Sequence, residues 1–325
     1  MAESILGMYV SIIVCTHLPD NYSNLVKAVE SLLEQTHREK EIIVVIDGNP
    51  ELYERVSADY RSQEEIIPVL LKENSGVSAA RNAGIRVAKG DIIAFLDDDA
   101  FAEKDWLKQL ISTYQRLDAI AVGGKILPTW IKGRPNYFPE ELDWLVGVTD
   151  EVFAGDKVTE VRNTFGPNMS FKSEVFREIG LFSRIFGFVG TSFIQAEEPE
   201  LALRMKRKFG KNVIYNPKAV VYHIISPSKL TVDRLLKRSF FQGYSKALIK
   251  KMGTSTDSLA TEKSYLKHVL LKRIPYRLKR VYHLNELKKV VMLTTSIICV
   301  ALGFVYGYLR KTNSSKILLP NTPDN

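Results

Sequence analysis

The first half of the chain alternates short apolar runs with longer amphipathic stretches. The apolar runs are MYVSIIV, EIIVVI, IIPVLL, DIIAFL and AIAVGG. Between the first two, Leu25, Val29, Leu32 and Leu33 recur at helical spacing. Because parallel strands are buried on both faces and need helical crossovers, this alternation is typical of βαβ units. We therefore predict an α/β fold, with an open and mostly parallel sheet flanked by helices.

Polar residues follow three of the first four predicted strands. They are Cys15, Thr16 and His17 after the first strand, Asp47 and Gly48 after the second, and Asp97, Asp98 and Asp99 after the fourth. Ligands of such sheets bind beyond the carboxyl ends of the strands. The pattern thus indicates a binding site at one edge of the sheet.

The run FLDDDA is the strongest single element of this predicted site. Three carboxylates at the end of a buried strand repel one another unless a cation or several donors are present. Mg²⁺ or Mn²⁺ fits, because such an ion takes one or two carboxylates and completes its shell with water and substrate phosphates. Asp97 and Asp99 are the candidate ligands for a metal that would balance charge on a leaving diphosphate. The alternative is a solvated turn or a helix cap.

Two further residues point to a nucleotide. Asp47 ends a strand directly before Gly48, where its carboxylate can accept hydrogen bonds from a base or a ribose. Arg81 lies in NSGVSAARNAGI, whose small residues predict a helix packed closely on the sheet. Its guanidinium suits a phosphate or the aspartate cluster. A simple turn at Asp47 and an ordinary surface arginine at position 81 are the alternatives.

Composition narrows the class of protein. With 325 residues, 45% of them hydrophobic and 25% charged, the chain can bury a large core and is not disordered. The net charge of +8 is concentrated toward the C-terminus, which favours contact with anionic lipid or phosphate over nucleic acid. The two cysteines, Cys15 and Cys299, both lie in apolar runs, so a disulfide framework is not expected.

The C-terminal part predicts a membrane anchor. Residues 290–309 carry no charge over twenty positions, enough for one transmembrane helix, although a buried helix of a soluble protein has the same pattern. Residues 263–289 contain nine Lys or Arg and interleaved leucines, which predict a basic helix on the membrane surface or a solvated helix. No basic residue precedes Lys27, so no secretory signal is expected. The positive-inside bias then places the large N-terminal part in the cytoplasm.

The middle of the chain is less regular. Residues 128–165 are rich in Pro, Gly and aromatic residues, which predicts an irregular segment covering the substrate. A helix is expected at 197–209, and strands at 212–215 and 220–223. A nucleotidyltransferase is a rival at the level of the fold, but it would carry a Gly-rich basic loop after the first strand, where this chain reads CTHLPDN.

Several motifs together resemble one known family. In order along the chain they are VCTHLPDNYSNLVKAVESLLEQT, VVIDG, NSGVSAARNAGI, FLDDDA, GPNMSFKSEVFREIGLF and AEEPELALRM. Their order and spacing are similar to family 2 glycosyltransferases with the GT-A fold, over about residues 8–225. The joint occurrence is far more specific than any one motif.

The resemblance implies roles for individual residues. Thr16, Asp47, Arg81, Asp97 and Asp98 would border the nucleotide-sugar, with Asp47 on the uracil. Asp97 and Asp99 would form the DxD element, and His223 would lie near the diphosphate or the metal, a core histidine being the alternative. The general base would be Glu198, where the family usually has aspartate, with Glu197 as the neighbouring candidate.

The resemblance also implies a reaction and an organisation. The activity would be inverting transfer of a sugar, from UDP-hexose or UDP-hexuronate, to a lipid-linked acceptor such as a polyprenyl or dolichyl phosphate saccharide. Protein N-glycosylation is one such pathway; surface polysaccharide assembly and a catalytically silent sugar-nucleotide-binding protein are alternatives. A phosphate acceptor would need no base. We expect a nucleotide-sugar half at 8–127 and an acceptor half at 128–225 within a catalytic domain of residues 1–225. Membrane-proximal helices at 226–289, the transmembrane helix and a short tail at 310–325 would follow.

Overall fold

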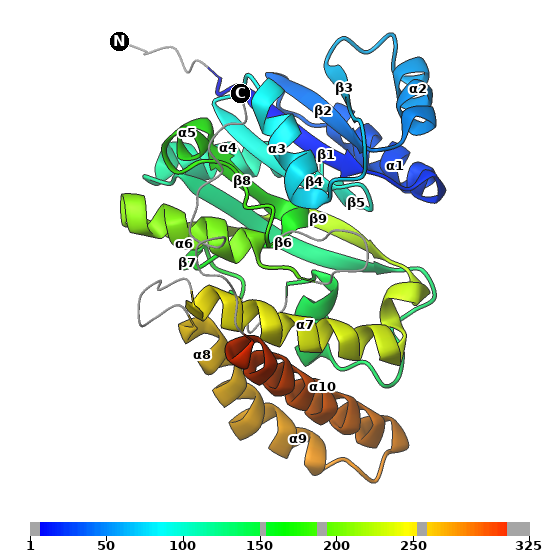
Figure 1. Ribbon diagram of the computed structural model, residues 1–325, viewed down its shortest axis with the longest axis vertical. Coiled ribbons are helices and arrows are strands. Elements are labelled where there is room, and N and C mark those ends of the chain that lie inside the picture. Colours follow the sequence, from blue (N-terminus) through cyan, green and yellow to red (C-terminus); the bar gives the residue numbers. More distant parts are fainter. Residues whose placement is uncertain (1–6, 150–153, 187–193, 252–258, 311–325) are drawn as a thin grey trace.

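A computed structural model describes residues 7–149, 154–186, 194–251 and 259–310 (Figure 1). In these residues nine strands form one sheet with the order β3-β2-β1-β4-β8-β6-β9-β5, and β7 also pairs with β9. The strands are β1 Val10–Thr16, β2 Lys40–Asp47, β3 Ile66–Leu71, β4 Ile92–Asp97, β5 Ala100–Ala102, β6 Ala121–Trp130, β7 Thr159–Val161, β8 Met169–Lys172 and β9 Val213–Ile225. Every predicted apolar run is thus a strand.

The sheet is parallel in its first half and mixed in its second. Strand β1 pairs in parallel with β2 and β4, and β2 pairs in parallel with β3. Strand β8 then runs antiparallel between β4 and β6, while β5 and β7 run antiparallel to β9. All eight residues of β2 are buried, as expected for a parallel strand covered by helices on both faces.

Helices cover both faces of the sheet. They are α1 Tyr22–Leu33, α2 Pro50–Asp59, α3 Val77–Val87, α4 Trp106–Arg116, α5 Ser173–Ile179 and α6 Glu197–Phe209. Because successive strand residues point to opposite faces, Ile12 packs with α1, α2 and α4, whereas Ile13 packs with α3, α5 and α6. On α3, a Cβ added to Gly84 would lie 2.7 Å from the side chain of Ile13, so the glycine permits close helix-to-sheet packing. This closeness positions the N-terminal part of α3 over the edge of the sheet.

Strand β9 differs from the prediction of two strands. It is continuous from Val213 to Ile225, because an irregularity in its pairing with β6 accommodates the residues after Asn216. The Asn216 side chain donates to Thr113 Oγ1 at 2.9 Å and accepts from the Lys218 amide at 2.9 Å. The side chain thereby replaces ladder hydrogen bonds, and the strand continues to His223.

The segment predicted to be irregular contains regular structure in its described residues. Strand β6 extends through Trp130, a 3₁₀ helix covers Glu140–Val146, and β7 covers Thr159–Val161. Asn168 ties the following segment to the sheet, accepting from Trp106 Nε1 at 2.9 Å and donating to Ala219 O at 2.9 Å. This part of the chain lies along the sheet edge that carries the predicted site.

The C-terminal helices form a layer below the sheet (Figure 1). They are α7 Val232–Lys251, α8 Ala260–His268, the π-helical turn Val269–Arg273, α9 Ile274–Leu278 and α10 Leu284–Leu309. Helix α10 contains the predicted span 290–309 but begins at Leu284, and it is long and apolar enough to cross a membrane by length and composition. Of the predicted tail, residues 311–325 lie outside the described residues.

Helix α10 packs against α7 at a crossing of glycines. A Cβ on Gly243 would lie 1.9 Å from the carbonyl oxygen of Val300, and a Cβ on Gly303 would lie 1.9 Å from that of Phe240. Only a residue without a side chain fits at either position. The opposite face of α10 is apolar and exposed, with Ile298 and Leu302 each 57% exposed. One face of the helix is therefore part of the protein and the other faces outward.

The basic segment before α10 is partly buried. Arg277 is 5% exposed and donates to Glu141, at distances from 2.7 Å, and to Glu286 at 2.8 Å. It also pairs with Glu140. These contacts join α9 and α10 to the 3₁₀ helix Glu140–Val146. For Arg277, neither predicted alternative holds, since its guanidinium faces neither lipid headgroups nor open solvent.

Candidate active site

The three aspartates make the turn between β4 and β5, at the carboxyl end of the parallel half of the sheet. Each has a different partner. The Asp97 side chain is 36% exposed and lies 3.6 Å from Arg81 Nη2, whereas Asp98 Oδ2 accepts from Thr16 Oγ1 at 2.6 Å. Burial and the neighbouring charge of Asp99 raise the pKa of Asp98 to about 7. The Asp98 carboxyl is thus turned inward toward the end of β1, and Asp97 faces the cavity.

Asp99 is bound by two groups from the C-terminal part of the chain. Its Oδ1 lies 3.0 Å from His223 Nε2, and its Oδ2 pairs with the Lys229 ammonium. Burial alone would raise the pKa of Asp99, but His223 and Lys229 outweigh it and hold the pKa well below its usual range. The His223 Nδ1 atom is buried without a partner in the described residues. His223 therefore faces the aspartate turn and is not an apolar core residue.

These groups have the chemistry of an open metal site. Among the described residues, no group of three or more His, Cys, Asp or Glu is arranged to hold a metal ion by itself. A divalent ion that also binds diphosphate and water needs only one or two carboxylates, and an imidazole suits Mn²⁺. Asp99 and His223 already lie within 3.0 Å of each other, and Asp97 lies two residues away. The residues present fit such an ion.

Arg81 joins the two halves of the site. Its Nη1 atom lies 3.2 Å from Glu197 Oε1 and 3.5 Å from Glu198 Oε1, while its Nη2 atom faces Asp97. The Arg81 side chain is 5% exposed, which excludes an ordinary surface arginine. Although burial opposes the charge, the surrounding carboxylates raise the pKa of Arg81. One guanidinium thus holds three acidic side chains from β4 and α6.

The two glutamates at the start of α6 have different environments. The Glu197 side chain is 5% exposed and its Oε2 atom is buried without a partner in the described residues, whereas the Glu198 side chain is 17% exposed. Burial, followed by the charge of Glu198, raises the pKa of Glu197 to about 8. At neutral pH, Glu197 is therefore protonated. Both glutamates line the cavity, and Glu198 is the more exposed of the two.

Asp47 is oriented by the loop that precedes α3. Its two carboxylate oxygens accept hydrogen bonds from the amides of Ser75 and Gly76, each at 2.8 Å. Gly48 has a φ of 76°, and a Cβ there would lie 2.2 Å from the amide nitrogen of Asn74, so the turn requires glycine. Asp47 lines the cavity, but part of its accepting capacity is used in fixing this loop.

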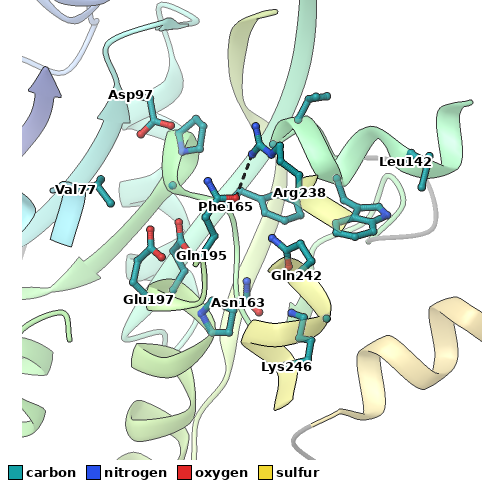
Figure 2. Close-up of a pocket in the computed structure, with 18 of the residues that line it drawn as sticks. Val77, Asp97, Leu142, Asn163, Phe165, Gln195, Glu197, Arg238, Gln242 and Lys246 are labelled. Carbon is teal, nitrogen blue, oxygen red and sulfur yellow. Dashed lines mark hydrogen bonds between the residues drawn. The ribbon is translucent and has the colours of Figure 1, made fainter. Parts of the chain in front are cut away.

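All predicted site residues line one cavity of about 1150 Å³. Figure 2 shows Asp97 and Glu197 on one side of it and Arg238, Gln242 and Lys246 of α7 on the other. Residues that the sequence reasoning missed also line it: Lys229, Arg234, Arg238, Gln242 and Lys246, with Ile297, Val300, Ala301 and Phe304 of α10. The polar residues at 234, 238, 242 and 246 recur every four positions, and this spacing in a basic helix was the available signal.

A comparison with family models decides the identity of the chain. Residues 11–180 match the model of "Glycosyl transferase family 2". The chain belongs to glycosyltransferase family 2. This segment contains β1, the aspartate turn and Arg81, and it covers 170 of 325 residues, a little over half of the chain. The protein is therefore a glycosyltransferase enzyme.

This glycosyltransferase is similar over nearly its whole length to one named enzyme. The glucosyl-dolichyl phosphate glucuronosyltransferase of Haloferax volcanii is 37% identical over 316 residues, which are 94% of this chain and 100% of the relative. A match over 94% of the chain extends well beyond residues 11–180 and into the C-terminal helices.

Solved structures show the same fold at low identity. The mannosyltransferase PcManGT of Pyrobaculum calidifontis, in complex with GDP-Man and Mn²⁺, matches with a TM-score of 0.61 at 16% identity, covering 93% of this chain and 88% of that one. S. aureus TarS 1–349, in complex with UDP-GlcNAc, matches with a TM-score of 0.56 at 16% identity, covering 93% and 89%. The glycosyltransferase has the GT-A fold, as the resemblance of its motifs implied.

Proposed function

We propose that this glycosyltransferase moves a hexose or hexuronic acid from a UDP-sugar to a hydroxyl group of a lipid-linked sugar, with inversion at the anomeric carbon. The observation that carries the proposal is the Arg81 cluster, in which the cavity-facing Glu198 lies 3.5 Å from the same guanidinium that faces Asp97 of the aspartate turn. A donor-binding carboxylate and a candidate base thus border one cavity. The name of the Haloferax volcanii relative supports a lipid-linked acceptor and a hexuronic acid donor.

The donor would bind at the carboxyl ends of β1, β2 and β4. Asp47 would border the uracil, with Thr16 and the aspartate turn beside the ribose and diphosphate. Arg81 would hold Asp97 and the acidic start of α6 in place, and so fix the distance between donor and base. Thr16 would act through Asp98, to which it donates at 2.6 Å.

A divalent metal would be held by Asp97, Asp99 and His223, with Mg²⁺ and Mn²⁺ both chemically suitable. When bound, it would supply positive charge against the diphosphate that leaves. Lys229 lies against Asp99 and is placed to contribute further positive charge near the same phosphates. The two known structures in complex with GDP-Man and Mn²⁺ or with UDP-GlcNAc have this fold and support a nucleotide-sugar donor.

Glu198 would act as the general base. It would take the proton of the acceptor hydroxyl as the oxygen bonds to the anomeric carbon and the bond from that carbon to the diphosphate breaks. Arg81 Nη1 lies 3.5 Å from Glu198 Oε1 and would orient this side chain, which belongs to the first turn of α6. Glu197, protonated at neutral pH, would position Arg81 without taking a proton.

The acceptor and α10 together suggest the cellular location. Helix α10 would anchor the enzyme in a membrane as a single span, and the nine Lys or Arg of residues 263–289 would keep the catalytic domain on the cytoplasmic side. An acceptor in the same membrane would then reach the cavity without leaving the lipid. Protein N-glycosylation is a pathway that uses such acceptors.

The test is turnover by the purified enzyme in detergent with UDP-glucose, UDP-glucuronate and GDP-mannose, each with Mg²⁺ or Mn²⁺. Hexosyl-phosphoryl-polyprenol and polyprenyl phosphate are the two acceptors, and release of nucleoside diphosphate is measured. We expect release only with hexosyl-phosphoryl-polyprenol, and its loss in Glu198→Gln. Release with polyprenyl phosphate that survives Glu198→Gln would instead assign a phosphate acceptor. No turnover with any donor would favour a sugar-nucleotide-binding protein.

A further inference from the structure

We propose that Arg238 and its neighbours on α7 bind the phosphate of the acceptor, and that the cavity face of α10 binds the adjoining hydrocarbon chain. The α7 stripe is defined as Arg234, Arg238, Gln242 and Lys246, and the α10 wall as Ile297, Val300, Ala301 and Phe304. The proposal rests on the proposed function, in which the acceptor is a lipid-linked sugar, and it assigns that acceptor a place in the cavity.

The α7 stripe presents positive charge to the cavity. Its residues recur at four-residue intervals, so they lie on one face of α7, and all four line the cavity. Figure 2 shows Arg238, Gln242 and Lys246 directed into the space opposite Glu197. With a rise of 1.5 Å per residue, the stripe extends over roughly 18 Å. This is long enough to serve a second anion besides the donor diphosphate.

The middle of the stripe has no ion pair within 4.0 Å among the described residues. The Nε atoms of Arg234 and Arg238 are buried without a hydrogen-bond partner in the described residues. Burial and the adjacent charge of Arg234 lower the pKa of Arg238 to about 10, although the charge of Asp99 acts in the opposite direction. Lys246 differs, because it pairs with Glu262 of α8 at 2.8 Å. A buried donor atom without an acceptor is costly, and a phosphate matches the planar donor geometry of a guanidinium group.

The position of Arg238 favours the acceptor over the donor. Its Nη2 atom donates to Gln195 Oε1 at 3.2 Å, the contact drawn as a dashed line in Figure 2. Gln195 lies two and three residues before the two glutamates of α6. Arg238 is thus tied to the segment that carries the candidate base. A phosphate bonded to the sugar whose hydroxyl meets Glu198 would lie on this side of the cavity.

The α10 wall forms an apolar part of the cavity lining. Ile297, Val300, Ala301 and Phe304 line the same space as the aspartate turn and the α7 stripe. The lining therefore changes from carboxylates to cations and then to hydrocarbon, which is the order of hydroxyl, phosphate and prenyl chain in a lipid-linked sugar. The outward residues Ile298 and Leu302 extend the apolar surface to the lipid-facing side of α10. A soluble sugar phosphate would leave this wall unused.

Two variants with matched controls test the proposal. Arg238→Gln removes the charge inside the cavity, and Lys237→Gln removes the adjacent charge, whose side chain is 58% exposed. Ala301→Trp places an indole in the cavity beside the wall, and Leu302→Trp places the same side chain on the outward face. The acceptors are glucosyl-phosphoryl-farnesol, farnesyl glucoside and glucose 1-phosphate, which carry phosphate and chain, chain alone and phosphate alone. KM is measured for each acceptor and for the donor, and farnesyl phosphate binding is measured without donor by calorimetry.

We expect Arg238→Gln to raise KM for glucosyl-phosphoryl-farnesol about tenfold, with farnesyl glucoside and the donor nearly unchanged, since one charge-assisted contact is lost. Ala301→Trp should raise KM for both farnesyl acceptors and leave glucose 1-phosphate unchanged. Both variants should weaken farnesyl phosphate binding, and both controls should match wild type. These results would support the proposal.

Two results would overturn it. If Arg238→Gln raises KM for the donor and not for the acceptor, the guanidinium serves the donor diphosphate. If farnesyl phosphate binds both variants as tightly as wild type, the cavity holds the acceptor elsewhere. A failure of the proposed function would give a different result, because wild type would then transfer no sugar to any acceptor. Farnesyl phosphate binding that depends on Arg238 and Ala301 would still support the inference in that case.

Discussion

Arg81 Nη1 of α3 lies 3.2 Å from Glu197 Oε1 of α6, and both side chains are buried. Helix α3 follows β3 along the chain, whereas α6 precedes β9. A single buried contact between a guanidinium and a carboxyl group therefore joins two distant segments. Because Arg81 also faces Asp97 and Glu198, the same guanidinium holds three acidic side chains in one cluster.

Replacing Arg81 by Ala is expected to remove activity and to lower stability by about 3–5 kcal/mol, since the acidic side chains around the guanidinium lose their shared partner. Denaturant unfolding and turnover measure the two effects. Arg86→Ala is the control, because Arg86 is an exposed arginine on the same helix. A stable and active Arg81→Ala enzyme would contradict the linking role.

The two glutamates of α6 should respond differently to removal of their charge. Glu198→Gln is expected to lower kcat by about 100-fold or more, the usual scale for loss of a general base. Glu197→Gln should lower kcat less than about tenfold, because Glu197 is already protonated at neutral pH and Gln keeps its shape. Comparison of kcat for the two variants at pH 7 shows which glutamate is the base. The opposite order would make Glu197 the base.

Removal of divalent metal should stop turnover. We expect a chelator to abolish nucleoside diphosphate release and added Mn²⁺ or Mg²⁺ to restore it. His223→Gln should require about tenfold more metal for half-maximal turnover, as expected when an imidazole contact is lost. Asp99→Asn should not be rescued at any concentration. Full activity in the presence of the chelator would refute the metal site.

Stability should depend on pH through Glu262. Burial opposes its ionisation, but Lys246 and Arg162 outweigh burial and lower the pKa of Glu262 from 4.5 to about 2. A lowered pKa stabilises the folded state above the ordinary value of 4.5 and loses this effect as pH falls toward 2. Glu262→Gln should therefore be less stable than wild type at pH 7, by on the order of 2 kcal/mol.

The difference in Tm between wild type and Glu262→Gln should close as pH is lowered from about 4.5 to 2, because protonated Glu262 no longer pairs with its partners. Thermal unfolding in detergent over this range is the measurement. Glu178→Gln is the control, since Glu178 pairs with Lys208 on the surface. A difference that stays constant down to pH 2 would exclude an ionic origin.

The crossing of α7 and α10 at Gly243 and Gly303 should not tolerate even the small side chain of alanine. Gly303→Ala places a methyl group where the Phe240 carbonyl oxygen lies, and we expect a loss of about 1–3 kcal/mol from overpacking. Leu302→Ala, one residue away on the outward face, should change stability little. Thermal unfolding and protease cleavage near α10 report the result. Equal effects of both variants would mean that the crossing does not hold α10.

The first four strands could be predicted from sequence because their signals are local. Each is a continuous apolar run, and three of the four end directly at residues that line the cavity, as Asp47 and Asp97 illustrate. Strand β9 was harder, since Asn216 and Pro217 break the strand pattern while side-chain hydrogen bonds and a bulge restore it. Compensation of this kind involves Thr113, which lies far away in sequence.

The C-terminal half of the site was not predictable in the same way. The apolar composition of α10 indicates a helix for lipid, but only the fold shows that Val300 and Ala301 line the cavity and that Leu302 does not. Likewise the pairing of Lys229 with Asp99 joins residues 130 positions apart. The basic residues of α7 belong to the predicted membrane-proximal helices at 226–289, and only the fold shows that Arg238 lines the cavity.

The contacts at Gly243 and Gly303 also bear on how such enzymes can diverge. A membrane helix that serves only as an anchor can be exchanged for any other of the same length and hydrophobicity. Here, a substituted helix would also have to present glycine where the backbones meet and suitable side chains toward the substrate. Exchange of this segment between relatives should therefore succeed only when α7 is transferred with it, so the two helices are expected to be inherited as one unit.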